Sequence, residues 1–107
     1  MDRGLQILDA SEETQAEFDR LAAVWKRETA HLSSPSMIAK HWAYERIVEM
    51  GLVAIPLILR DLKKAPSLWF MALFAITGAS PTRPDDHGNI DALRASWLDW
   101  GERNHYI

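Results

Sequence analysis

The chain contains no cysteine among its 107 residues. That absence excludes a disulfide, a thiolate metal site and a cysteine nucleophile, and it is typical of proteins in a reducing cytoplasm. Glycine is sparse as well: the five glycines stand apart, so no glycine-rich loop is available to hold a phosphate group. The longest apolar run, residues 68–76, is too short to span a bilayer, and the N-terminus lacks the apolar core of a signal peptide. We therefore expect a cytoplasmic protein with no membrane span.

Basic charge is also in short supply. The chain has 12 Lys and Arg against 15 Asp and Glu, a formal net charge of −3. A protein dedicated to a nucleic-acid duplex usually has a basic face and a high pI, so this balance does not favour nucleic-acid binding. One basic group stands out, formed by Arg60, Lys63 and Lys64. Cations at the end of a helix oppose its dipole, which explains the group without a ligand, but it remains the candidate contact for a nucleic acid.

The composition is that of one folded domain. The chain is 48% hydrophobic and 25% charged, which is close to the average for globular proteins. Its length suits one domain around one core, so we expect residues 1–107 to form a single α-helical domain. Two alternatives stay open for residues 1–9, a flexible leader and a short arm docked by its few apolar side chains.

The first and last helices are signalled by capping residues and by apolar stripes. Ser11 is a typical N-cap residue, and the two acids that follow it suit the first turn of a helix. Asn89 is placed to cap the last helix, and Gly101 and the tail that follows it end the chain. Both segments carry apolar residues at helical spacing that should face the core. These residues are Phe18, Leu21, Ala22, Trp25 and Leu32 in the first segment, and Ile90, Leu93, Trp97 and Trp100 in the last.

The middle of the chain predicts three short helices, over residues 34–51, 55–64 and 67–78. A Pro in the first turn or a Gly just past the last turn marks these ends, and Ser67 is the expected N-cap of the third helix. That third segment is apolar on all sides, which is typical of a central helix covered by its neighbours, so we expect it to form the core. The sequence thus predicts an all-α fold of about five short helices in a compact antiparallel stack.

The central segment also carries a recognisable order of residues. The residues concerned are Gly51, Ala54, Pro56, Leu57, Ile76, Thr77 and Gly78. They resemble a HEAT-type helical repeat, in which a helix ending in Gly is often followed by Ala-x-Pro-Leu-Leu, a polar turn and an apolar helix ending near Thr-Gly. Only one full unit is present, whereas repeat arrays need about three. The resemblance therefore implies a minimal HEAT-like stack rather than a long solenoid.

A wider pattern runs through most of the chain. Its elements are Trp25, Glu28-Thr29, residues 32–34, His41, Tyr44, Ile47, Met50-Gly51, residues 56–59, Trp69-Phe70, Ala72-Leu73, residues 76–78, Trp97-Leu98 and Trp100-Gly101. This pattern resembles a group of short bacterial proteins of unassigned function, which often look like parts of mobile or defence-linked loci. The chain departs from that group at Trp42, where a Pro would be expected. The resemblance implies no particular activity.

No set of residues predicts an enzyme. The four histidines form no metal-binding pair of the His-x-x-x-His type, and the best local cluster, Asp85-Asp86-His87, is typical of a solvated turn. We expect His41 to be buried or half-buried and hydrogen-bonded to a backbone carbonyl. Ser33 or Ser34 could form a triad with His41 and Asp85, but the Gly-x-Ser-x-Gly turn of such a nucleophile is missing. We therefore expect no catalytic residue, no metal and no cofactor.

The aromatic residues give the better indication of function. Trp42, Tyr44 and Trp69 cannot all face one interior, so part of this set should be exposed. Trp, Tyr and Arg are common anchors of protein interfaces. Trp42, Tyr44 and Arg46 follow one another on the second predicted helix, which makes them the candidate partner-binding face.

Two functions follow from these features. The leading hypothesis is a non-enzymatic protein–protein interaction module, the small regulatory or antitoxin-like partner of a larger bacterial protein. The helical stack and the acidic first and last helices favour it. The alternative is a nucleic-acid-associated small subunit of a mobile-element or defence complex, which would use Arg60, Lys63 and Lys64.

Overall fold

The structure is a computed structural model that describes residues 11–82 and 88–107. Within these residues the chain forms α-helices and one short 3₁₀ helix but no strand, so the predicted all-α fold is confirmed. The elements are α1 (Glu12–Thr29), α2 (Pro35–Ala39), α3 (Trp42–Glu49), the 3₁₀ helix η2 (Gly51–Val53), α4 (Ala54–Lys64), α5 (Phe70–Thr77) and α6 (Ile90–Arg103). The two alternatives for residues 1–9 lie outside the described residues.

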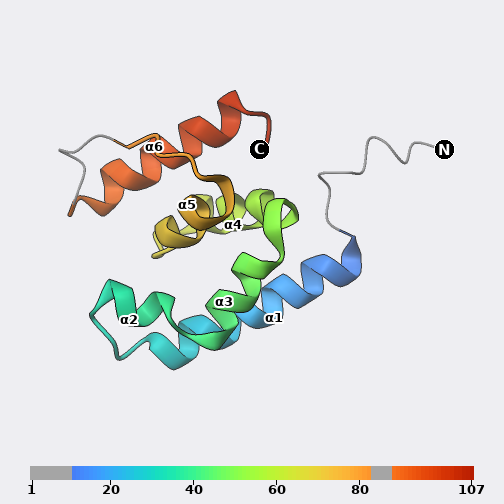
Figure 1. The fold of residues 1–107 in the computed structure, drawn as a ribbon, viewed down its shortest axis with the longest axis vertical. Helices are drawn as coiled ribbons and strands as arrows, with labels where there is room; N and C mark the ends of the chain where they lie inside the picture. Colours follow the sequence, from blue (N-terminus) through green and yellow to red (C-terminus); the bar gives the residue numbers. More distant parts are fainter. Residues whose placement is uncertain (1–10, 83–87) are drawn as a thin grey trace.

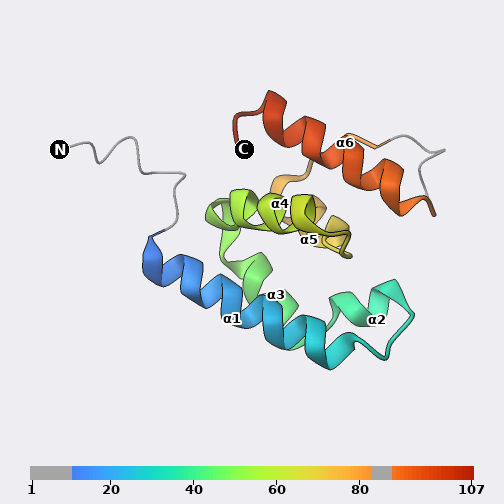
Figure 2. The same cartoon turned by 180° about the vertical axis from the view of Figure 1, so that it is seen from behind.

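The helices surround a central pair, α4 and α5 (Figure 1). Helix α6 lies on one side of this pair and contacts α4, whereas α1 and α3 pack together on the other side, where α3 contacts α5. Seen from behind, α4 lies in front of α5 (Figure 2). None of the described helices is both long enough and apolar enough to cross a membrane.

Several helix ends lie where their capping residues predict. The Ser11 hydroxyl accepts a hydrogen bond from the Thr14 N–H at 3.1 Å, and the Asn89 side chain accepts one from the Ala92 N–H at 3.0 Å. These bonds satisfy N–H groups that have no partner inside the helix. At the other end of α5, Gly78 adopts the left-handed conformation with φ 70°, as expected for a residue that ends a helix.

The predicted helix over residues 34–51 is wrong, because it is broken between α2 and α3. In a continuous helix the Ile38 carbonyl would accept from the Trp42 N–H. Instead it accepts from the indole Nε1 of Trp25 at 2.9 Å, since a buried indole needs an acceptor. His41 then takes an extended conformation, and its Nδ1 accepts from the Ala43 N–H at 3.1 Å to begin α3.

The central helix is α4 rather than α5, contrary to the sequence-based expectation. Its buried residues are Ala54, Ile55, Pro56, Leu57, Ile58, Leu59 and Leu62, whereas α5 buries only Ala72 and Leu73. Helix α5 also begins at Phe70, three residues after the expected cap Ser67, and no side chain from its own N-terminal turn caps it. Apolar composition alone therefore did not identify the most buried helix.

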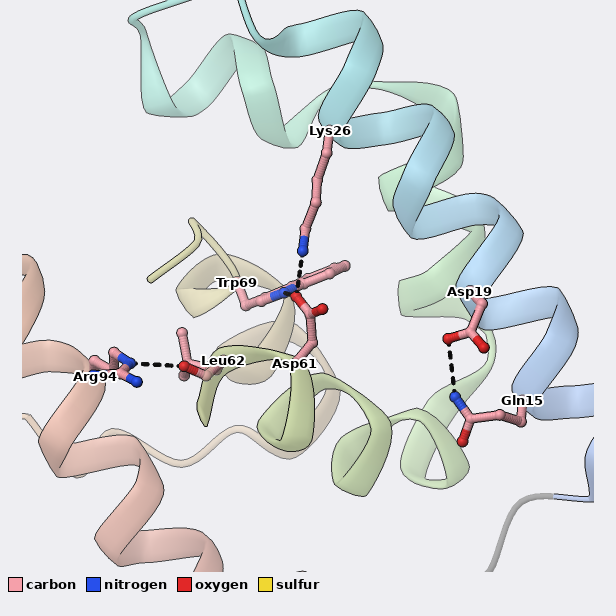
Figure 3. A network of polar contacts seen from close by, with 7 residues as sticks. All are labelled: Gln15, Asp19, Lys26, Asp61, Leu62, Trp69 and Arg94. Atoms are coloured by element: carbon pink, nitrogen blue, oxygen red, sulfur yellow. Dashed lines mark hydrogen bonds and ion pairs between the residues drawn. The ribbon is translucent and has the colours of Figure 1, made fainter. Parts of the chain in front are cut away.

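A cluster of aromatic rings joins the helices around Trp69, which is fully buried. The ring centroid of Trp69 lies 4.4 Å from that of Trp25 and 5.6 Å from those of Phe18 and Tyr44. The indole Nε1 of Trp69 donates to Asp61 Oδ2 at 2.8 Å, and the same oxygen accepts from Lys26 Nζ at 2.6 Å (Figure 3). The buried rings therefore pack against one another with their polar edges satisfied.

Helix α6 is held on α4 by a close approach and by an arginine. A Cβ on Gly101 would lie 2.5 Å from Leu59 Cδ1, so glycine lets the two helices meet closely. Arg94 Nε donates to the Leu62 carbonyl at 2.7 Å (Figure 3). Arg94 Nη2 donates to the Lys63 carbonyl at 2.7 Å, so two carbonyls at the end of α4 have partners. Helix α6 includes Gly101 and continues to Arg103.

Because only one side of α5 is buried, substitutions on its two sides should have different effects on stability. Leu73 is fully buried, so Leu73→Ala should lower the free energy of unfolding by about 2–5 kcal/mol. The neighbouring Phe74 is 57% exposed, and Phe74→Ala should lower it by less than about 1 kcal/mol although it removes more atoms. Urea unfolding followed by circular dichroism measures both. Equal losses in the two variants would contradict this assignment of the buried side.

Candidate functional site

Helix α5 has apolar residues on all sides, but the domain covers only one of them. Ala72 and Leu73 are fully buried, whereas Met71 is 51% exposed and Phe74 is 57% exposed. A helix that is apolar all round is normally covered all round. We call the uncovered residues Met71, Phe74 and Ala75 the α5 face.

On one side of this face lies a hollow of about 550 Å³ between α5 and α6. We call it the α5–α6 hollow. Its described lining is mostly apolar and includes Phe70, Met71, Phe74, Ala79, Leu93 and Trp97. Trp97 is almost fully buried, so the bottom of the hollow belongs to the packed core. Residues of α5 border its opening. The hollow is large enough to receive several apolar side chains of another molecule.

A second hollow, of about 320 Å³, lies on the other side between α3 and α5. We call it the α3–α5 hollow. Its lining combines Ala39, Tyr44, Val48, Met71 and Ala75 with two carboxylates, Glu45 and Glu49. Met71 and Ala75 line both hollows, so they form a ridge between them. The α5 face is therefore one continuous apolar surface with a hollow on each side.

Tyr44 on α3 fixes where α5 begins. Its hydroxyl donates to the Leu68 carbonyl at 3.0 Å and accepts from the Ala72 N–H at 2.8 Å. Ala72 is the third residue of α5, whose N–H has no partner within the helix, so Tyr44 caps α5 from another helix. Burial raises the pKa of the Tyr44 phenol well above its ordinary value, and the hydrogen bond from Ala72 offsets this only in part.

The predicted face of Trp42, Tyr44 and Arg46 is not brought together by the structure. Tyr44 is only 2% exposed, so its assignment as a surface anchor is wrong. Trp42 is 54% exposed and the Arg46 side chain is 59% exposed, and both stay candidates. Tyr44 is buried because its ring packs against Trp25 and Trp69. Arg46 lies 3.8 Å from a Glu17 oxygen on α1.

The basic group lies on the outer side of α4. Arg60, Lys63 and Lys64 are all exposed, and none of them forms an ion pair within the described part of the chain. Arg60 and Lys64 border a polar hollow of about 320 Å³ that also contains the carboxylates of Asp19 and Asp61. The cations are accessible to an anion, but acidic groups lie among them.

The histidine predictions have mixed outcomes. His41 is half-buried, as expected. Its Nε2 lies 2.7 Å from Glu28 Oε1, and its Nδ1 accepts a hydrogen bond from the Ala43 N–H. The expected hydrogen bond to a backbone carbonyl is therefore wrong. Because Nδ1 accepts, Nε2 carries the proton of the neutral ring and donates to Glu28. Asp85-Asp86-His87 lies outside the described residues. Over residues 11–82 and 88–107, no group of three or more potential ligands could hold a metal ion.

Sequence reasoning missed Met71 and Phe74. Helix α5 has eight residues, and a helix this short in a small domain does not bury all of its sides. The missed signal was the combination of an entirely apolar helix with too few neighbours to cover it.

The comparisons with known proteins give no further guidance, because no protein-family model, curated protein or solved structure matches the chain.

The cap from Tyr44 gives a second prediction. Tyr44→Phe removes the partner of a buried N–H and of a carbonyl while keeping the ring, so the free energy of unfolding should fall by about 1–3 kcal/mol. The control is Tyr106→Phe, whose hydroxyl makes no hydrogen bond within the described structure and whose loss should change it by less than about 0.5 kcal/mol. Amide hydrogen exchange should also accelerate at Ala72. An unchanged Ala72 exchange rate would show that Tyr44 does not cap α5.

Proposed function

We propose that this chain is a protein-binding module whose contact surface is the α5 face. The observation that carries the proposal is the 57% exposure of Phe74 on a helix without a polar side. Contiguous exposed apolar surface with hollows at its edges is typical of protein contact sites, because it favours burial against a partner. The role proposed is non-enzymatic.

The residue types on this surface suit an interface. Aromatic residues and methionine are enriched at the centres of protein interfaces. Phe74 supplies a large ring, and Met71 supplies a flexible side chain that can adapt to a partner between the two hollows. Ala75, one turn after Met71, leaves room for a partner to approach the helix backbone. The α5 face thus offers one large anchor and a low ridge beside it.

The position of α5 also supports this role. Its buried side is fixed by the cap from Tyr44 and by the packing of Leu73, so the exposed side is presented on a rigid element. A surface that is already ordered loses less entropy when a partner binds. Trp42 is a further exposed aromatic on α3, the helix that borders the α3–α5 hollow. We include Trp42 as a secondary contact.

The biological setting proposed is that of a small regulatory or antitoxin-like partner of a larger bacterial protein in the cytoplasm. The HEAT-like order of Gly51, Pro56 and Gly78 supports it, because short helical stacks commonly present a surface to another protein. The absence of cysteine is in keeping with a reducing compartment.

Photo-crosslinking in cells of the source organism tests the proposal. A benzoyl-phenylalanine placed at Phe74 or at Met71 should give a covalent adduct with the same protein. The same group placed at Ala23, which is exposed on α1 and lines neither hollow, should give none. An adduct from Trp42 without one from Phe74 would move the interface to α3. Equal adducts from all positions would contradict a defined contact surface.

A second candidate function is nucleic-acid association through Arg60, Lys63 and Lys64. The observation that favours it is that these three cations are exposed and unpaired within the described residues. Each phosphate contact adds to the salt dependence of binding.

For this second function we expect Lys63→Ala combined with Lys64→Ala to lower the slope of log affinity against log salt by about 2, measured by fluorescence anisotropy with a random-sequence oligonucleotide. The variant Lys26→Ala is not a suitable control, because Lys26 is bonded to Asp61. Lys40→Ala is suitable, since Lys40 is exposed and lies outside α4. If the unmodified protein does not bind the oligonucleotide at low salt, this second function is excluded.

A further inference from the structure

We propose that the partner of the α5 face is a basic amphipathic helix, and that Glu45 and Glu49 on α3 select it. This inference rests on the proposed function and adds the chemistry of the partner. It is carried by the placement of two carboxylates at one edge of an apolar surface.

The shape of the surface suits a helix. The ridge of Met71 and Ala75 runs between two hollows, both of which are open to the outside. An amphipathic helix binds an apolar surface by placing apolar side chains that are three or four residues apart into neighbouring depressions. The two hollows are such depressions. The apolar stripe of the bound helix would cover Phe74 and enter the α5–α6 hollow. The edge of that stripe would then lie beside α3.

The charges at that edge have one sign. Glu45 and Glu49 both line the α3–α5 hollow, and none of its lining residues is a lysine, arginine or histidine. Glu45 makes no ion pair within the described residues, and Glu49 is 4.0 Å from Arg46 Nε, a weak exposed contact. Both carboxylates are therefore able to pair with cations brought by a partner.

The spacing of the two acids adds to this argument. Like charges four residues apart on a helix repel each other and destabilise the helix. Lysine or arginine side chains from a partner would relieve this repulsion on binding. Complementary charges at the edge of an interface chiefly determine which partner is accepted and how fast it associates. Glu45 and Glu49 are thus placed as specificity-determining residues, while Phe74 supplies the apolar anchor.

A second copy of this chain is a poorer occupant. A symmetric dimer about an axis through α5 would place the same face on both copies. With an axis that crosses α5 at right angles, Glu45 and Glu49 of one copy would approach the same acids of the other. With an axis along α5, they would face the α5–α6 hollow of the other copy, whose described lining contains no lysine, arginine or histidine. Charge complementarity therefore favours a separate, basic partner.

The test is a selection of displayed peptides on the full chain. The library consists of 18-residue helical peptides with leucine fixed along one stripe and with either lysine or glutamate at each position beside it. The unmodified protein should enrich lysine, whereas Glu45→Lys combined with Glu49→Lys should enrich glutamate. The Phe74→Glu variant should enrich neither the lysine peptides nor the glutamate peptides. Circular dichroism melting confirms that each variant is folded.

A matched control separates local from overall charge. Glu12→Lys combined with Glu102→Lys makes the same change in net charge at exposed residues that line neither hollow. This variant should retain the preference for lysine. The best lysine peptide should bind the unmodified protein about 10-fold more tightly than it binds the variant reversed at Glu45 and Glu49, and about equally to the control.

The outcomes distinguish the inference from the proposed function. Enrichment that depends on Phe74 but is the same on the unmodified and charge-reversed proteins would overturn the inference and leave the α5 face as a binding surface. No enrichment on any variant would also overturn it, and crosslinking at Met71 and Phe74 would still decide the proposed function. Analytical ultracentrifugation would overturn the inference if it showed a dimer of the unmodified protein and a monomer of Phe74→Glu. The α5 face would then be the contact between two copies of this chain.

Discussion

The burial of the Trp69 indole is the constraint on which the other features of this structure depend. The ring lies at the start of α5, and rings from α1 and α3 pack against it. Its N–H must have an acceptor once it is removed from water, and the carboxylate of Asp61 on α4 provides one. That carboxylate is in turn paired with Lys26 on α1. One buried side chain thereby connects four helices.

The exposed face of α5 is a consequence of the same packing. Because Trp69 is held in the core, the helix begins at the next residue, and the Tyr44 hydroxyl reaches its first turn. This start directs Leu73 toward the core and Phe74 away from it. The candidate binding surface is therefore the side of α5 that faces away from its buried residues Ala72 and Leu73, and the aromatic cluster fixes where this helix begins. Changes to the cluster should alter the surface even though the two share no side chain.

The candidate site was harder to predict than the fold, and the residues show why. A contact face was expected on α3 because Trp42, Tyr44 and Trp69 could not all face one interior. The structure exposes Trp42 and buries the other two. In α5 no such contrast exists between neighbouring residues. Since nearly every side chain of that helix is apolar, periodicity does not distinguish Phe74 from Leu73. The open side depends on how many helices the domain can place around α5.

The sequence by itself determined the features that arise within a few residues. Ser11 and Asn89 cap their helices and Gly78 ends α5, because each acts on N–H groups or on backbone angles close to it in the chain. Only the tertiary structure decided the break before α3, the start of α5 and the side of α5 that stays open. These features depend on contacts between distant segments, namely Trp25 with the Ile38 carbonyl and Tyr44 with the Ala72 N–H. A buried polar group takes the partner that the assembled core brings to it, and local sequence does not specify that partner.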